Sequence, residues 1–211
     1  KLPYYSHVLP YHDEATPLSM TGIKALPIME FDDPQFPGAK YLPESLEIIK
    51  RLDFQNHLKN EFVTHSTTSP LLSALAEIEK PLFKLCMPHW IYTPEFNDQS
   101  RSYFLNKKEK KRGPFYLLVQ NKKNHLDELT QKMAIIEEDL VPYYNQQKSL
   151  TILDILIAST LWGLYILPEF QFSEKTHTYL QLIKKECRFD YYAPFWQPDW
   201  PKQPCLINSL L

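Results

Sequence analysis

The residues best suited to chemistry lie in two short stretches, Leu26-Pro27 and Pro43-Glu44-Ser45. The second stretch stands at the expected start of a helix, where exposed backbone N–H groups and the helix dipole favour an anion. Ser45 could hold a carboxylate there through its hydroxyl and the backbone. In the alternative interpretation, Glu44 only complements the dipole and Ser45 satisfies a local N–H group. The residues alone leave both interpretations open.

The Leu26-Pro27 stretch could present backbone groups to a ligand. A cis bond before proline is uncommon in folded proteins, about 5–6% of such bonds. A cis bond here would turn Leu26 so that its N–H and C=O face a ligand, which could pair with them like an added strand. The alternative, which the pattern by itself favours, is an ordinary trans proline on an edge strand.

The three cysteines offer no evident redox or metal site. Cys86 and His89 are three residues apart, the minimum for a nucleophile–base pair or two metal ligands, but Pro88 is expected to interrupt the helix between them. We therefore expect Cys86 to be a buried structural residue. Cys187 and Cys205 lie in no motif, and we expect no metal site. Scattered cysteines in odd number suit a reducing, cytoplasmic location.

Composition and charge exclude several function classes. The formal net charge is -2, which gives no electrostatic reason to expect nucleic acid or an anionic membrane as a partner. The chain has 4 glycines and no glycine-rich phosphate loop. The apolar stretch 151–167 is interrupted by polar residues and lacks basic flanks, so it predicts a buried core helix rather than a membrane anchor. The basic run 107–112 is interpreted as a solvated face near a helix C-terminus.

The first 63 residues predict a small α/β domain. Residues 4–9 are aromatic and β-branched, which favours a strand. Thr16 and Pro17 predict a helix start, and Gly22 a helix stop. Further elements are expected as a strand at 25–31, a turn at Pro37-Gly38, a return strand at 40–42 and a helix that Pro43 opens.

Residues 64–211 predict an all-helical domain, which the polar segment 64–69 separates from the first. Ser69 and Pro70 predict a helix start, and two apolar stripes follow at helical spacing. The stripes are Leu71, Leu75, Ile78, Leu82 and Leu85, and Leu126, Leu129, Met133, Ile136 and Leu140. Thr151 and Asp154 predict a capping box, and another helix is expected at 174–186 before an aromatic tail.

A family resemblance adds to this interpretation. The run from Met20 to Ile28, which contains Thr21-Gly22 and Leu26-Pro27-Ile28, and the run Tyr41-Leu42-Pro43-Glu44-Ser45 together resemble the glutathione-binding half of the bacterial glutaredoxin 2 family. Tyr103-Phe104 with Lys107-Lys108-Glu109, and the closing Ile207-Asn208-Ser209-Leu210-Leu211, are similar to other stretches of that family. Thr151-x-x-Asp154 resembles the capping box of the wider glutathione transferase fold.

The resemblance implies a thioredoxin-like N-terminal domain, here expected to lack its first strand and helix, followed by a helical glutathione transferase-like domain. It also implies a glutathione site. Leu26 would pair with the ligand's central residue beside a cis Pro27, Glu44 would accept from its ammonium group, and Ser45 would hold its γ-glutamyl carboxylate. The loop 34–39 is longer than the family pattern and is expected to alter the rim of this site.

The implied activity is glutathione-dependent disulfide reduction, with glutathionylated or disulfide-bonded proteins as partners and a monomer as the acting form. Members of the family begin with a strand leading to Cys-Pro-Tyr-Cys, whose first thiolate attacks a disulfide. No cysteine of this sequence matches that motif, so we expect the redox cysteines upstream of residue 1 and little reductase activity from these 211 residues. A natural form without the redox centre stays open, as does a transferase-like conjugating or non-catalytic glutathione-binding protein.

Overall fold

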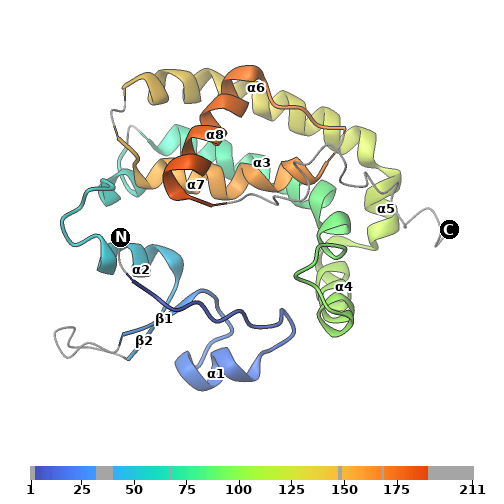
Figure 1. Ribbon diagram of the computed structural model, residues 1–211. Helices are drawn as coiled ribbons and strands as arrows, with labels where there is room; N and C mark the ends of the chain where they lie inside the picture. Colours follow the sequence, from blue (N-terminus) through green and yellow to red (C-terminus); the bar gives the residue numbers. More distant parts are fainter. Residues whose placement is uncertain (1–2, 32–39, 67, 147–148, 168, 190–211) are drawn as a thin grey trace. The chain divides into compact units, whose positions relative to one another are not determined.

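A computed structural model describes residues 3–31, 40–66, 68–146, 149–167 and 169–189. Within it the chain forms two compact units (Figure 1). The first consists of Lys1–His57 with Pro94–Phe104, and the second of Leu58–Thr93 with Leu105–Leu211. The expected domain boundary between residues 63 and 64 stays a prediction.

The first unit combines two helices with a two-stranded sheet. Its elements in chain order are α1 (Ala15–Thr21), β1 (Ile28–Glu30), β2 (Tyr41–Pro43), α2 (Ser45–Leu52) and the beginning of α4 (Asp98–Arg112). β1 and β2 are antiparallel. The strand predicted at 25–31 is shorter than expected, in part because Pro27 has no N–H group to give to a ladder.

The first helix begins and ends as the sequence predicts. Thr16 donates its backbone N–H and its hydroxyl to the two carboxylate oxygens of Asp13, at 3.0 and 2.7 Å. These bonds, the backbone one first, lower the pKa of Asp13. Gly22 ends α1 at φ 74°, a left-handed conformation that glycine adopts without a Cβ penalty, and its N–H bonds to Leu18.

The strand predicted at residues 4–9 is wrong. These residues belong to no strand of the described chain, and the side chains of Tyr4, Tyr5 and Val8 are 76, 96 and 88% exposed. A strand is stabilised by backbone bonds to a neighbour, and none of the described residues pairs with this segment. Aromatic and β-branched composition alone therefore did not determine the local structure.

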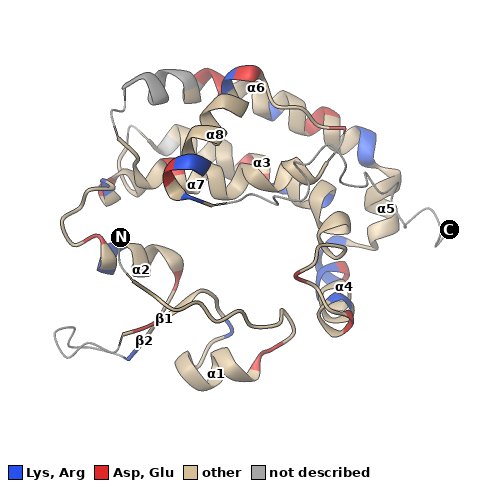
Figure 2. Ribbon diagram, viewed as in Figure 1, with Lys and Arg blue, Asp and Glu red and all other residues tan. Residues whose placement is uncertain are grey.

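The second unit is helical. Its elements are η1 (Asn60–Val63), α3 (Ser69–Trp90), the end of α4, α5 (Phe115–Gln120), α6 (Lys122–Gln146), α7 (Ile152–Leu161), η2 (Trp162–Ile166) and α8 (Glu174–Cys187). The basic run lies on the last turns of α4, as predicted, and Figure 2 shows these cations there. None of the helices that the structure describes has the length and apolar character that a bilayer crossing requires.

Both predicted apolar stripes face the core of this unit. All five predicted positions of α3 and the last four of the α6 stripe are buried, and Leu126 packs partly buried against them. They contact α7 and α8 residues that include Leu153, Ile157, Leu161 and Leu180, each 0% exposed. Full burial of one such side chain stabilises a fold by about 1.5–3 kcal/mol. The apolar stretch from residue 151 is thus a core helix followed by a 3-10 turn.

The expectation that Pro88 interrupts the helix between Cys86 and His89 is wrong. α3 runs from Ser69 to Trp90 and contains both Pro81 and Pro88. An internal proline removes one backbone hydrogen bond and costs about 3 kcal/mol. Leu82 and Leu85 are almost fully buried on this part of the helix, and that packing stabilises the helical conformation through both prolines.

The predicted capping box at the start of α7 is present and extends further than predicted. The Asp154 carboxylate accepts from the Thr151 backbone N–H at 2.7 Å and from the Thr151 hydroxyl at 2.8 Å. Its other oxygen accepts from the Tyr179 hydroxyl of α8 at 2.7 Å. Asp154 is only 5% exposed, so the box joins two helices inside the core.

Several predictions fall outside the described residues. They are the turn at Pro37-Gly38, the loop 34–39, the aromatic tail from Tyr191 to Trp200, Cys205, and the run Ile207-Asn208-Ser209-Leu210-Leu211.

Candidate functional site

The two predicted binding stretches meet at one end of the small sheet. The strands pair Ile28 with Pro43, Met29 with Leu42 and Glu30 with Tyr41. Pro27 precedes the first of these pairs and Glu44 follows it. Leu26-Pro27 and Glu44-Ser45 therefore lie at the same end of the hairpin, although 17 positions separate Pro27 from Glu44 in the sequence.

The Leu26–Pro27 bond is cis, as expected. Both residues are exposed, and Leu26 exposes 54% of its surface. Among the described residues, the backbone N–H and C=O of Leu26 have no hydrogen-bond partner. Those two groups are therefore available to an extended ligand that lies along this edge.

The start of α2 supplies the second half of the candidate site. The Glu44 carbonyl accepts the first helical bond, from Ile48 at 3.0 Å, and the helix begins at Ser45. The first N–H groups of any helix have no intrahelical partner, and they carry the positive end of the dipole. The Glu47 carboxylate in the same turn forms an ion pair with Lys50, whose Nζ lies 2.7 Å from its Oε1.

Glu44 and Ser45 are both exposed, and within the described chain neither side chain makes a hydrogen bond. The alternative interpretation, in which Ser45 satisfies a local N–H group, is therefore not what the structure has. Glu44 also adopts φ 74°. A non-glycine residue in this region costs about 1–3 kcal/mol, and such residues concentrate at binding and catalytic sites.

A third group near the hairpin was missed by the sequence analysis. Lys24, two residues before Leu26, donates to Glu14 and to Tyr103 of α4. Its position inside the run Met20 to Ile28 was one available signal. Its partner 79 positions away could not be identified from spacing.

The described thiols lie in environments that disfavour the thiolate. Burial raises the pKa of Cys86 well above its usual value, and its Sγ donates to the Gly163 carbonyl at 3.4 Å. Cys86 is thus the buried structural residue that was predicted. Burial also raises the pKa of Cys187, with Asp154 and Glu186 adding to the effect.

The environment of His89 makes it a weaker base than an exposed histidine. Burial, with a contribution from Lys122, lowers the pKa of His89 to about 4. Within the described residues, no group of three His, Cys, Asp or Glu side chains could hold a metal ion.

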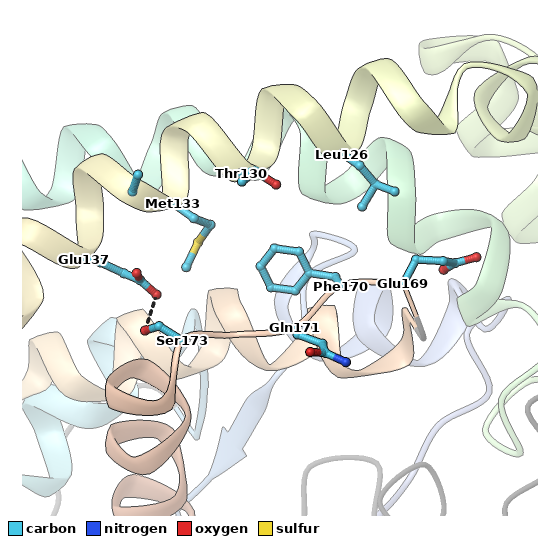
Figure 3. Close-up of a pocket in the computed structure, with 9 residues that line it drawn as sticks. Leu126, Thr130, Met133, Glu137, Glu169, Phe170, Gln171 and Ser173 are labelled. Atoms are coloured by element: carbon cyan, nitrogen blue, oxygen red, sulfur yellow. Dashed lines mark hydrogen bonds between the residues drawn. The ribbon is translucent and has the colours of Figure 1, made fainter.

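The helical unit contains a pocket of about 330 Å³ between α6 and residues 169–173. Figure 3 shows Met133 and Phe170 facing this space and Glu137 bonded to Ser173, at 2.7 Å. None of the predicted site residues lines this pocket. The candidate site remains the hairpin end of the first unit.

Comparison with known families decides the classification. Residues 71–193 match the family described as glutaredoxin 2, C terminal domain. The chain belongs to the glutaredoxin 2 family. Glutaredoxin 2 of Escherichia coli K12 is 27% identical over 144 residues, which are 66% of this chain and 63% of that protein. The same values hold for glutaredoxin 2 of Escherichia coli O157:H7.

The fold comparison agrees with this classification. The crystal structure of glutaredoxin 2 from Salmonella typhimurium in complex with glutathione has a TM-score of 0.74 with this chain. The match covers 90% of this chain and 85% of that one at 23% sequence identity. The chain therefore has the glutaredoxin 2 fold, a small N-terminal β region with a helical C-terminal part. It spans 63% of the length of the curated relatives it matches.

Proposed function

We propose that this protein binds glutathione at the hairpin end formed by Leu26, Pro27, Glu44 and Ser45. The observation that carries the proposal is the pairing of Ile28 with Pro43, which brings two exposed stretches with unsatisfied hydrogen-bonding groups to one edge. Glutathione is an anionic peptide with both a backbone and a γ-glutamyl end group. The backbone of Leu26 is suited to the ligand's backbone, and Glu44 and Ser45 are suited to its γ-glutamyl end group.

Each residue has a distinct proposed role. The free N–H and C=O of Leu26 pair with the central residue of the ligand. The Ser45 hydroxyl and the first N–H groups of α2 hold the γ-glutamyl carboxylate, with help from the helix dipole. The exposed Glu44 carboxylate accepts from the ligand's ammonium group.

The reaction class we propose is glutathione-dependent thiol–disulfide exchange of the glutaredoxin 2 type, in the cytoplasm. Family membership and the fold support it. In this reaction a protein thiolate attacks a disulfide, and glutathione reduces the resulting mixed disulfide. Glutathionylated or disulfide-bonded proteins would then be the partners, with no metal required, and the protein would act as a monomer.

A second candidate is glutathione binding without disulfide exchange, as in a transferase or a non-catalytic protein. The environments of Cys86 and Cys187 favour it, because burial raises both pKa values and neither thiol is poised as a nucleophile. The two candidates differ in the residues encoded before residue 1. Cys-Pro-x-Cys there favours exchange, and a lone Ser, Tyr or Cys favours the second candidate. Robust reduction of a glutathione mixed disulfide by these 211 residues alone would contradict the expectation that the redox cysteines lie upstream.

Isothermal titration with reduced glutathione tests the binding proposal. Ser45→Ala and Glu44→Gln should each weaken binding by about tenfold or more, because each removes a hydrogen bond to a charged group worth about 1.5–3 kcal/mol. Glu47→Gln is the matched control, since it removes a carboxylate of the same helical turn that Lys50 already occupies. Equal affinities for all three variants and the unsubstituted chain would refute the site.

A further inference from the structure

Lys24 is held by several groups of the first unit. Its Nζ lies 3.0 Å from a Glu14 carboxylate oxygen, 2.6 Å from the Tyr103 hydroxyl and 3.4 Å from the Tyr11 carbonyl. The Tyr103 hydroxyl in turn donates to the Glu14 carboxylate. Glu14, Lys24 and Tyr103, called the Lys24 latch below, thus form a closed set of hydrogen bonds.

Aromatic packing fixes the partners of Lys24 in place. Tyr11 contacts Phe96, Tyr103 and Phe104, with ring centroids 5.5, 5.9 and 5.1 Å away. Phe104 is only 3% exposed. The Lys24 ammonium also lies 4.0 Å from the Tyr103 ring centroid, within the range of a cation–π interaction. The latch is therefore anchored to a packed cluster rather than to mobile surface side chains.

The ammonium group stays charged in this setting. Desolvation lowers the pKa of Lys24, but the hydrogen bonds from Tyr103 and Glu14 outweigh it, and the pKa is raised overall. The side chain is only 22% exposed. A cation held in this way is occupied by protein groups and is poorly placed to bind a ligand anion itself.

Lys24 lies in the short segment that carries the Leu26–Pro27 bond. Residues 23–27 connect the end of α1 at Gly22 to the first residue of β1, and they include the cis Leu26–Pro27 bond. Within the described chain, the other hydrogen bonds of residues 23–27 are two local bonds between Ile23 and Thr21. Among the described residues, the Lys24 side chain therefore makes the hydrogen bonds that join this segment to distant parts of the first unit.

We propose that the Lys24 latch positions the Leu26 backbone for glutathione, so that Lys24, Glu14 and Tyr103 are positioning residues and not ligands. This inference rests on the proposed function. It goes beyond that function by assigning a role to Tyr103 of α4, 79 positions beyond Lys24 in the sequence. Removing the Tyr103 hydroxyl should loosen residues 23–26 even when no glutathione is present.

The test compares Tyr103→Phe and Lys24→Met with the unsubstituted chain by two readouts. The first is the backbone order parameter from ¹⁵N NMR relaxation without ligand, which should fall at residues 23–26 from about 0.85 toward 0.6. The second is glutathione affinity, which should weaken about tenfold, equal to about 1.4 kcal/mol. Lys24→Arg keeps the charge and the donors and should restore both values toward those of the unsubstituted chain. Tyr116→Phe, at an exposed tyrosine of α5, is the matched control and should change neither.

The two readouts separate the latch from the site. Unchanged order parameters at residues 23–26 in both Tyr103→Phe and Lys24→Met would overturn the latch, whatever the affinities. Unchanged affinity in mobilised variants would also overturn it, because the loosened segment would then not matter for binding. A third result is that the unsubstituted chain binds no glutathione while Tyr103→Phe still lowers the order parameters of residues 23–26. That result overturns the proposed function, and the Lys24 latch then only orders this segment.

Discussion

The buried carboxylate of Asp154 provides the most quantitative prediction for the stability of the helical unit. It accepts hydrogen bonds from the Thr151 backbone N–H, the Thr151 hydroxyl and the Tyr179 hydroxyl, at 2.7, 2.8 and 2.7 Å. Asp154→Ala would remove the carboxylate that accepts these bonds from the Thr151 backbone N–H, the Thr151 hydroxyl and the Tyr179 hydroxyl. Tyr179→Phe would remove the hydroxyl bond to Asp154 and leave the capping box intact.

The expected losses follow from these contacts. An unsatisfied buried polar group costs about 1–3 kcal/mol, and hydroxyl donors can rotate to reduce that cost. We therefore expect Asp154→Ala to lower the free energy of unfolding by about 4 kcal/mol, near the upper end for single substitutions. Tyr179→Phe removes one bond to a charged acceptor and should cost about 1.5–3 kcal/mol.

Equilibrium urea denaturation, followed by far-ultraviolet circular dichroism, measures both losses. Asp127→Ala is the control, since this exposed aspartate lies on the surface of α6 and its substitution should change stability by less than about 0.5 kcal/mol. The reasoning is refuted if Asp154→Ala costs no more than Asp127→Ala. It is also refuted if Tyr179→Phe costs more than Asp154→Ala, because the carboxylate would then not be the centre of the network.

Three further outcomes follow from individual side chains. Burial lowers the pKa of His89 to about 4, so NMR should show its imidazole titrating near that pH and not near 6.5. The free energy of unfolding should decrease as the pH falls from 6.5 to about 4, because His89 binds a proton in the unfolded chain but not in the folded one over that range. Cys86 should resist alkylation in the folded protein and react only after denaturation, as peptide mass spectrometry would record. Hydrogen bonds and charge from Lys80 and Lys132 lower the pKa of Glu77 from 4.5 to about 2. The ionised Glu77 carboxylate therefore stabilises the fold above pH 4.5, and this contribution is lost as the pH falls toward 2. Glu77→Gln should therefore flatten the pH dependence of the urea midpoint over that window.

The helical unit was largely predictable because its signals are local. Apolar side chains at helical spacing, such as Leu75 and Ile78 or Leu129 and Met133, can be buried together only if the segment is helical. The capping box of α7 likewise involves only four consecutive positions, Thr151 to Asp154. The contact of Asp154 with Tyr179 was not predictable, because it depends on how two helices pack.

The errors arose where local preference met a tertiary condition. Residues 4–9 have strand-forming side chains, yet strand structure requires a partner that sequence composition does not supply. Pro88 breaks helices by local reasoning, but the packing of α3 around it stabilises the continuous helix. In both cases the outcome was set by neighbours rather than by the residues themselves.

The candidate site was only partly predictable. The residue types at Leu26-Pro27 and Glu44-Ser45 indicated two binding stretches, but the residues alone did not tell whether they share one surface. That depends on the register in which Ile28 faces Pro43. The Lys24–Tyr103 bond was hidden for a similar reason, because its partners lie 79 positions apart.

The central claim is that one edge of the first unit recognises glutathione. The most direct measurement is a ¹⁵N–¹H NMR titration of the 211-residue chain with reduced glutathione. We predict saturable shifts in the amides of Leu26, Ile28, Ser45 and Leu46, with the α6 amides that line the pocket of Figure 3 unchanged. Shifts confined to the helical unit, or no saturable shifts at all, would contradict the account.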